Sequence, residues 1–416
     1  MKDHVAIVGA GVVGLSTAYD LLNRGFRVTI LEKDAQECEG CSFGNGGLIV
    51  PSHFVPLAAP GMVMMGLRML ADRRSPFGVE RITDFQTLSW MARFALAGTK
   101  AHVERCAPLL RDLNLASWGL YERMIAEMGV DVGFARKGLL MLSRTPAAHR
   151  AEAKLGEEAN RLGLRTTDLS PKDLQSLEPQ LEMDVAGAVL FEDDAHLTPS
   201  TFMRALRAHV VAQGARLLAG DAMTKFRTEG WRVASIVHQA GELQADHYVL
   251  AAGAWSGELA ATFRLRLPML AGRGYGITAT NPPQRPRIPA IFTEARVAVT
   301  PMQEGVHFVG TMELSHPVVR PTSPRVEAMR ENVSRYYPAY KPADLDGTTW
   351  CGLRPCSPDG MPYIGRSRRA ENLVIATGHA MMGMSLGPVT GKLVGELIAD
   401  EKPSHPLDLL SPDRYA

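Results

Sequence analysis

Three glycines near the start of the sequence have a spacing that suits phosphate binding. Gly9, Gly11 and Gly14 form a Gly-x-Gly-x-x-Gly turn between an apolar segment, residues 4–8, and an amphipathic segment, residues 13–23, that we expect to be helical. The first glycine permits a tight turn, the second lets the backbone approach a pyrophosphate, and the third lets helix and strand pack closely. N–H groups at the start of the helix favour negative charge. We therefore predict a dinucleotide site at this turn.

An acidic residue completes this unit. Glu32 follows a second apolar segment, residues 26–31, and lies 18 positions after Gly14. A carboxylate at this place accepts hydrogen bonds from the two hydroxyls of a ribose and disfavours the 2′-phosphate of NADP. The combination of strand, turn, helix and acidic residue is a more specific signal of dinucleotide binding than the glycine motif alone. A glycine-rich turn that has only a packing role is the alternative interpretation.

A second glycine-rich turn near the end of the sequence favours FAD over NAD. Residues 376–388 form a strand–turn that leads into a helix expected over 389–398. The positive end of such a helix could face the C2 carbonyl of a flavin and stabilise the anionic reduced ring. NAD would leave this segment without a role, so we predict FAD as the cofactor.

Composition and charge exclude several functional classes. The 416 residues include 45 Lys and Arg against 44 Asp and Glu, a formal net charge of +1, so we expect no nucleic-acid partner. No uninterrupted apolar run could span a membrane and no secretion signal is visible, so we expect a cytoplasmic protein, which an odd number of cysteines also suits. Cys38 and Cys41 could join Cys351 and Cys356 in a thiolate metal site, but this spacing is a weak signal and we predict no metal.

The distribution of apolar segments predicts two interleaved domains. Residues 4–32 form a strand–helix–strand unit, and segments 248–253 and 373–378 run into glycines, as parallel strands do beside a ligand crevice. Residues 61–194 are rich in helical periodicity, whereas 259–347 contain short alternating runs typical of antiparallel strands. We predict an α/β fold in which a Rossmann-like FAD-binding domain is interleaved with an α+β substrate domain built on an antiparallel sheet. The predicted FAD-binding segments are 1–60, 195–258 and 348–416, and the predicted substrate-binding segments are 61–194 and 259–347.

Six segments along nearly the whole chain carry a set of motifs in a fixed order: residues 5–32, 42–48, 194–199, 250–256, 352–360 and 378–391. These motifs and their order resemble the D-amino acid oxidase-like flavoproteins, and most of all their bacterial D-amino acid dehydrogenase subgroup. Glycine oxidases are more distant relatives.

The resemblance implies which residues hold FAD. Some relatives attach the flavin to a cysteine in the segment around Gly352, but Cys351 stands one place too early, so we expect FAD to be non-covalent. The residues that the resemblance places at FAD are Gly9, Gly11, Gly14, Glu32 and Lys33, then Ser42, Asn45, Gly46, Gly47 and Leu48 near the flavin, Met223 near the adenine, Gly253, and Gly383, Met384 and Ser385 at the ring.

The same resemblance places Arg354 at the substrate. In the matching Gly-Leu-Arg-Pro segment of relatives such as glycine oxidase, the arginine binds the substrate carboxylate, and a guanidinium does grip a carboxylate through two parallel hydrogen bonds. A structural salt bridge is the alternative. With the carboxylate held and the amine neutral, hydride can leave Cα for flavin N5 without a side-chain base, giving an imino acid and then a 2-oxo acid and ammonium.

Three further residues are candidates for a catalytic role. His379 lies in the terminal glycine-rich turn and His53 follows the glycine-rich loop, so either could tune the flavin or hold the amine, although a lone histidine is more often structural. Tyr275 belongs to a Gly-Tyr pair common in the subgroup, with a packed strand tyrosine as the alternative.

A methionine-rich segment bears on the identity of the electron acceptor. Residues 61–70 combine methionines with an arginine, and Arg73 and Arg74 follow, which suits either an amphipathic contact with a membrane or a packed core. The resemblance favours the first, with residues 61–100 as the membrane contact of a peripheral dehydrogenase on the cytoplasmic side of the inner membrane and quinone or another respiratory acceptor as partner.

Other functions stay open at this point. One is a D-proline or hydroxy-D-proline dehydrogenase, another is a glycine- or sarcosine-type oxidase that uses oxygen, and a third is a non-catalytic FAD-binding subunit of an assembly. The preferred amino acid and the oligomeric state do not follow from the residues.

Overall fold

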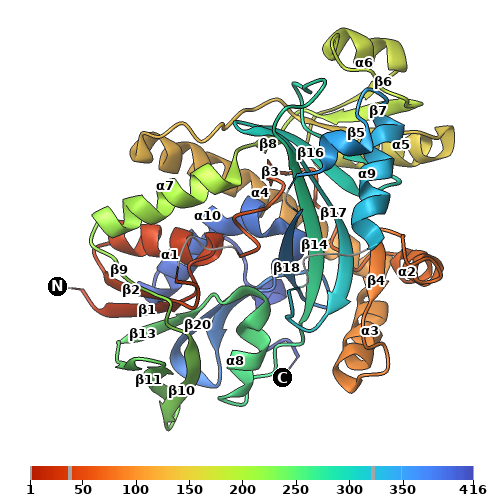
Figure 1. Ribbon diagram of the computed structural model, residues 1–416. Coiled ribbons are helices and arrows are strands. Elements are labelled where there is room, and N and C mark those ends of the chain that lie inside the picture. The colour runs from red at the N-terminus through yellow and green to blue at the C-terminus, as the bar shows by residue number, and fades with distance from the viewer. Residues whose placement is uncertain (1, 36–39, 320–323, 348, 416) are drawn as a thin grey trace.

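The computed structural model describes residues 2–35, 40–319, 324–347 and 349–415 (Figure 1). Cys38, one of the cysteines considered for a metal site, lies outside the described residues. Two large sheets organise the chain, and segments far apart in the sequence contribute to each. The predicted α/β fold with a second, antiparallel sheet is therefore confirmed.

A six-stranded sheet carries the predicted strand–helix–strand unit. Its order is β19-β20-β13-β1-β2-β9, with the five strands from β20 to β9 parallel and β19 antiparallel at one edge. Near-continuous apolar runs form its central strands because both faces are covered. The strands are β1 (His4–Val8), β2 (Arg27–Glu32), β9 (Arg216–Ala219), β13 (His247–Leu250), β19 (Tyr363–Ser367) and β20 (Ala370–Thr377).

Helices cover one face of this sheet, where α1, α7 and α10 lie together (Figure 1). Helices α1 and α10 cross closely because two glycines of α10 leave room: a Cβ on Gly391 would lie 2.5 Å from the backbone of Ser16, and one on Gly387 would lie 2.6 Å from Val12. This crossing brings the N-termini of both helices to the same edge of the sheet. The helices are α1 (Val12–Asn23), α4 (Lys100–Met128), α7 (Pro199–Ala212) and α10 (Gly383–Ile398).

A smaller layer packs on the opposite face and shares a hydrophobic core with it. It consists of a three-stranded antiparallel sheet and one short helix. These elements are β10 (Met223–Glu229), β11 (Arg232–His238), β12 (Gly241–Leu243) and α8 (Ser256–Ala261).

The second large sheet has nine strands and is mostly antiparallel. Its order is β18-β14-β17-β16-β15-β5-β7-β6, and β4 pairs with β17. Helix α9 packs against the core of this sheet. The elements are β4 (Phe77–Val79), β5 (Leu139–Ser143), β6 (Thr166–Leu169), β7 (Gly187–Phe191), β14 (Leu270–Ala279), β15 (Ala290–Phe292), β16 (Val297–Met302), β17 (Gly305–Ser315), β18 (Thr349–Cys356), α5 (Pro146–Arg161), α6 (Pro171–Leu177) and α9 (Pro324–Tyr336).

Helices α2 (Met62–Leu70) and α3 (Phe85–Ala97) project together at one end of the molecule, beside β4 and β17 (Figure 1). No residue of α2 is buried. In the part of the chain that the structure describes, no helix combines the length and the apolar character needed to cross a bilayer.

Two segments of the predicted domain division are wrong. Strand β18, which we assigned to the FAD-binding domain, pairs along its whole length with β14 in the nine-stranded sheet. Helix α4, which we assigned to the substrate domain, buries Leu110, Leu113 and Tyr121 in the core beneath α1 and α10. An apolar face shows that a segment is packed but does not show which sheet it packs on, so the sequence could not make either assignment.

Candidate active site

Two neighbouring cavities, each of about 340 Å³, lie where the two large sheets meet. The nucleotide cavity is lined by the glycine-rich turn after β1, the end of β2 and the start of α10. The substrate cavity is lined by α2, α3 and strands of the nine-stranded sheet. Cys41 and Asn45 line both cavities, so a ligand in one can reach a ligand in the other.

Close backbone packing shapes the glycine-rich turn. Gly9 has a φ of +105°, and a Cβ there would lie 2.5 Å from the carbonyl oxygen of Ala251. A Cβ on Gly14 would lie 1.9 Å from the carbonyl oxygen of Gly9, so Gly14 allows α1 to start directly at the turn. Gly11 has only the Ser42 hydroxyl near its Cβ position, at 3.4 Å, and lines the cavity. The turn thus leaves an open backbone surface of the kind a pyrophosphate needs.

The carboxylate of Glu32 is buried at the end of β2 and lines the nucleotide cavity. Its Oε2 accepts a hydrogen bond from the backbone N–H of Ala10 at 2.7 Å, and its Oε1 accepts one from Asp34 at 3.1 Å. These bonds orient the carboxylate before any ligand binds. Lys33, the next residue, holds its ammonium group 4.4 Å from the centroid of the Trp255 ring.

Two helix N-termini meet at the nucleotide cavity. Neither Gly11, before α1, nor Met382, before α10, caps its helix with a side chain. The first N–H of α1, from Val12, donates to the Ser42 hydroxyl at 3.0 Å. Uncapped N–H groups and helix dipoles suit phosphates and an electron-rich ring. With the Glu32 carboxylate placed for a ribose, this set of donors and acceptors fits FAD.

Helix α4 holds the start of α10 in place. The Tyr121 hydroxyl donates to the carbonyl of Met384 at 2.5 Å, and the Ser385 hydroxyl donates to the side-chain oxygen of Asn114 at 2.5 Å. Ser385 also accepts the backbone N–H of Val50 at 2.9 Å. Its polar atoms are therefore used within the protein.

The structure brings most of the residues predicted to bind FAD to the two cavities. Gly46 and Leu48 line the substrate cavity, whereas Gly14, Gly47 and Ser385 line neither and instead allow close packing or anchor neighbours. The residues that line the nucleotide cavity are Gly9, Gly11, Glu32, Lys33, Ser42, Asn45, Met223, Gly253, Gly383 and Met384.

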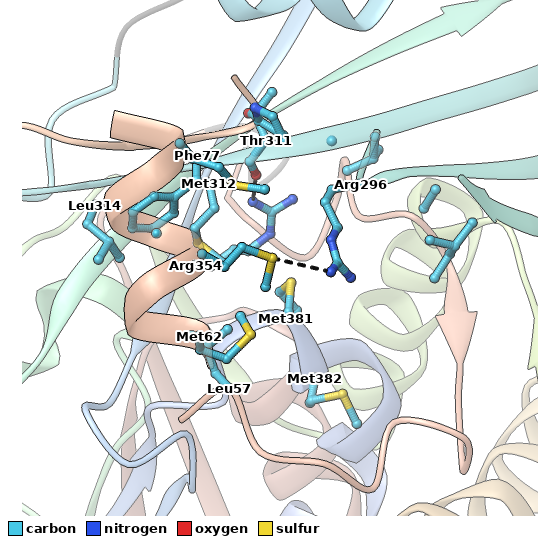
Figure 2. Close-up of a pocket in the computed structure, with 18 of the residues that line it drawn as sticks. Leu57, Met62, Phe77, Arg296, Thr311, Met312, Leu314, Arg354, Met381 and Met382 are labelled. Atoms are coloured by element: carbon cyan, nitrogen blue, oxygen red, sulfur yellow. Dashed lines mark hydrogen bonds between the residues drawn. The ribbon is translucent and has the colours of Figure 1, made fainter. Parts of the chain in front are cut away.

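Arg354 extends from β18 into the substrate cavity (Figure 2). Its Nη1 donates to the carbonyl oxygen of Thr311 at 2.7 Å, and Thr311 has a φ of +67° where the pairing of β14 with β17 shifts register. A Cβ on Gly274 of β14 would lie 2.1 Å from Nη1, so the glycine makes room for the guanidinium. Within the described residues no carboxylate forms an ion pair with Arg354, which argues against the salt-bridge alternative.

Of the two predicted histidines, His379 is buried and His53 is half-buried, and both are uncharged near pH 7. His53 lines the substrate cavity, and burial, assisted by the positive charge of Arg296, lowers its pKa to about 4. His379 lines the nucleotide cavity, where its Nε2 lies 2.9 Å from the Thr390 hydroxyl and burial lowers its pKa to about 3. Each ring is neutral near pH 7 and can accept a hydrogen bond.

The prediction of a catalytic role for Tyr275 is wrong. Its ring is fully buried in the core of the nine-stranded sheet, its hydroxyl donates to Glu313 at 3.2 Å, and it lines neither cavity. Successive side chains of a strand point to opposite faces, so Tyr275 points away from the face on which Gly274 meets Arg354.

Sequence reasoning missed a second arginine and most of the apolar walls. Arg296 has a φ of +55° in the turn between β15 and β16, and its guanidinium points into the same cavity as that of Arg354 (Figure 2). The lining contains no carboxylate among the described residues. Two signals for the walls are present in the sequence: the methionine-rich segment 61–70, which suits a membrane contact or a core, and Met381, which predicts a more apolar mouth of the site. The apolar wall residues include Met62, Met65, Met69, Phe77, Trp90, Phe94, Met312, Met381 and Met382.

The site thus consists of a Rossmann-like nucleotide cavity beside an apolar cavity that contains the guanidinium groups of Arg354 and Arg296. The model of the DAO family, described as FAD dependent oxidoreductase, matches residues 4–397. The chain therefore belongs to the DAO family of FAD-dependent oxidoreductases, and FAD is its cofactor. The family resemblance seen in the motifs is confirmed.

Individual relatives agree with this family over the full chain. The chain is 31% identical over 419 residues to a D-amino-acid oxidase of Bradyrhizobium diazoefficiens, with 99% of each chain covered. It is 26% identical over 401 residues to a D-amino acid dehydrogenase of Helicobacter pylori, with 96% of each covered. A crystal structure of glycine oxidase from Geobacillus kaustophilus has the same fold, with a TM-score of 0.76, 22% identity and 100% of each chain covered.

Proposed function

We propose that the protein is a D-amino acid dehydrogenase that converts its substrate to an imino acid, which hydrolyses to a 2-oxo acid and ammonium. The observation that carries this proposal is the Arg354 guanidinium, which has no ion-pair partner among the described residues and lies in an apolar cavity next to the nucleotide cavity. The names of the relatives at 31% and 26% identity support the choice of D-amino acids.

The residues of the chain supply binding, orientation and exclusion of water. Bound FAD provides a hydride acceptor. Arg354 holds the substrate carboxylate through charge-assisted hydrogen bonds, which fixes the position of Cα. The methionine and aromatic walls exclude water, and no carboxylate among the described lining residues stabilises an ammonium ion there. The cavity therefore favours the neutral amine that hydride loss requires.

We also propose that FAD is bound without a covalent link. Cys351 lines neither cavity, and Cys41, which lines both, has a thiol whose pKa is raised by burial, so it is a weak nucleophile. Precipitation of the protein with acid should release all the flavin into the supernatant, and yellow colour that stays in the pellet would contradict this.

For the electron acceptor we propose a membrane quinone. Helices α2 and α3 line the substrate cavity on one side and expose apolar residues on the other, with Phe85 85% and Leu96 80% exposed. Arg68, Arg73 and Arg81 are exposed in the same region. Apolar groups flanked by arginines suit the surface of an anionic membrane, so we place the protein on the cytoplasmic face of the inner membrane.

Anaerobic bleaching of the flavin absorption band tests the proposal. The purified protein is mixed with D- and L-amino acids, glycine, sarcosine and both enantiomers of proline and hydroxyproline. Bleaching by D-enantiomers, followed by faster reoxidation with a soluble quinone than with oxygen, is the expected result. Bleaching by glycine or sarcosine with fast reoxidation by oxygen would indicate an oxidase instead. Bleaching by D-proline or hydroxy-D-proline alone would narrow the substrate to cyclic amines, and no bleaching would overturn the substrate class.

A further inference from the structure

Two buried residues, Ser52 and Asp194, and the half-buried His53 form a hydrogen-bonded chain that ends at the substrate cavity. The Ser52 hydroxyl lies 2.5 Å from Oδ2 of Asp194 and 3.0 Å from Nδ1 of His53. The backbone N–H of Ser52 donates to Oδ1 of the same aspartate at 3.0 Å. Strands β3 (Leu48–Ile49) and β8 (Ala195–His196) pair with each other and bring these two distant segments together (Figure 1). The hydrogen bonds of such a chain run in one donor-to-acceptor order, because a hydroxyl group has one hydrogen and donates it to one acceptor.

The hydrogen bonds determine which nitrogen of His53 carries hydrogen. When Asp194 is ionised, the Ser52 hydroxyl donates to its carboxylate, so the hydroxyl oxygen can only accept from His53. Nδ1 is then the protonated nitrogen, and Nε2 keeps a lone pair. No residue in the described part of the chain forms a hydrogen bond with Nε2, and the His53 ring lines the substrate cavity that contains Arg354.

The charges around this chain disfavour a protonated imidazole and tolerate a protonated carboxyl. Burial and the charge of Arg296 lower the pKa of His53, as noted above. Burial raises the pKa of Asp194 to about 8, against the opposing effect of its two hydrogen bonds from Ser52, and the neighbouring Asp193 raises it further. Glu152 is half-buried, and desolvation raises the pKa of its carboxyl to about 7 against the opposing effect of the positive charge of Arg296. A proton that reaches His53 is therefore better held by Asp194, and the chain takes up a proton only in molecules in which Asp194 is ionised, a fraction that becomes large near pH 8.

We propose that His53, Ser52 and Asp194 form a proton relay that removes a proton from the ammonium group of the bound substrate. The inference rests on the proposed function, since it assigns the step that prepares the amine. The substrate N–H bond breaks and an Nε2–H bond forms on His53, the Nδ1 proton passes to the Ser52 oxygen, and the Ser52 hydroxyl proton passes to Oδ2 of Asp194. No electrons are exchanged. His53 changes tautomer without becoming charged, and the substrate nitrogen gains the lone pair that forms the imine.

The pH dependence of flavin reduction separates a relay from a structural role. The rate constant of anaerobic bleaching is measured by rapid mixing between about pH 6 and pH 10.5, with the amino acid that bleaches the wild type fastest. In Ser52→Ala the rate near pH 8, where Asp194 of the wild type is ionised in a large fraction of molecules and the substrate amine is still mostly protonated, should fall by on the order of 10- to 100-fold, the size of a lost proton-transfer contribution. It should recover to within about threefold at the highest pH, where the free amine predominates and no relay is required.

Three further variants sharpen the test. Ser52→Thr retains the hydroxyl and should restore the wild-type profile. Asp194→Asn keeps the shape of the carboxyl but cannot take the proton, so it should behave like Ser52→Ala. Ser117→Ala removes a buried hydroxyl of α4 that has no partner in the described residues and should leave the profile unchanged.

Each outcome decides between the two proposals. A loss in Ser52→Ala that is equal at every pH, or an unchanged profile, would overturn the relay and leave the dehydrogenase proposal standing. No bleaching of the wild type by any amino acid would overturn the dehydrogenase proposal, and the relay with it.

Discussion

The two cavities of this protein are built in different ways. The nucleotide cavity is formed largely by the glycine-rich turn, the end of β2 and the start of α10, and the Glu32 carboxylate in its lining is hydrogen-bonded to the turn. The substrate cavity is formed by side chains from α2, α3 and several strands of the nine-stranded sheet. Backbone recognition requires short glycine motifs at set spacings, whereas a side-chain cavity can be built from many sequences. Variants in each cavity should therefore fail in different ways.

The largest effect is expected at Arg354. Arg354→Met keeps much of the side-chain volume but removes the guanidinium, so kcat/KM for D-amino acids should fall by about 100- to 1,000-fold, the cost of losing a charge-assisted contact with a desolvated carboxylate. Flavin content, read from the visible absorption band, should stay that of the wild type. Arg264→Met changes an exposed arginine outside both cavities and is the control. Unchanged kcat/KM in Arg354→Met would contradict a carboxylate-bearing substrate.

At Gly14, in contrast to Arg354, a substitution should weaken the binding of FAD. In Gly14→Ala the new methyl group would lie 1.9 Å from the Gly9 carbonyl oxygen and push α1 away from the turn. FAD should bind on the order of 10- to 100-fold more weakly, since overpacking costs about 1–3 kcal/mol. Titration of the apoprotein with FAD measures this. Gly119→Ala adds a methyl where no atom lies within 4 Å and should bind FAD normally. Equal affinities of the two variants would show that the close approach is unimportant.

Substitutions on the exposed faces of α2 and α3, the helices that line the substrate cavity, should affect membrane binding alone. Phe85→Asp places a charge on the exposed face of α3 and should weaken binding to phosphatidylglycerol-containing vesicles by roughly tenfold or more, because a buried phenylalanine contributes about 1.5–3 kcal/mol. Vesicle co-sedimentation gives the affinity, and flavin bleaching should not change. Trp231→Asp alters another exposed aromatic residue, 62% exposed and outside α2 and α3, and should bind like the wild type. If neither wild type nor variant sediments, the membrane proposal fails.

The smallest effect is expected at Gly274, which makes room for Arg354. In Gly274→Ala the added methyl would overlap Nη1 and displace the guanidinium, so KM should rise by about three- to tenfold with a smaller change in kcat. Steady-state kinetics with a D-amino acid separates the two constants, and Gly119→Ala again serves as the control. A fall in kcat with unchanged KM would mean that the glycine matters for something other than carboxylate binding.

Much of the nucleotide site could be predicted because its signals are local. Gly9, Gly11 and Glu32 lie within one strand–helix–strand unit, and the structure places all three at one cavity. Ser385 and Gly14 were also singled out, but their atoms serve packing and hydrogen bonds inside the protein. A motif indicates that a residue type is required at a position and does not distinguish contact with a ligand from support of a neighbour.

The sequence by itself determined the strand–helix–strand unit of residues 4–32 with its glycine-rich turn and Glu32, since these residues lie close together in the chain. Only the tertiary structure decided that α4 supports the start of α10, that Tyr275 is a core residue and that Arg296 shares a cavity with Arg354. The pairing of β3 with β8, which joins Ser52 to Asp194, is of the same kind. These arrangements depend on contacts between distant segments, whose free energy comes from burial and hydrogen bonding in the folded chain and leaves no periodic pattern in the sequence.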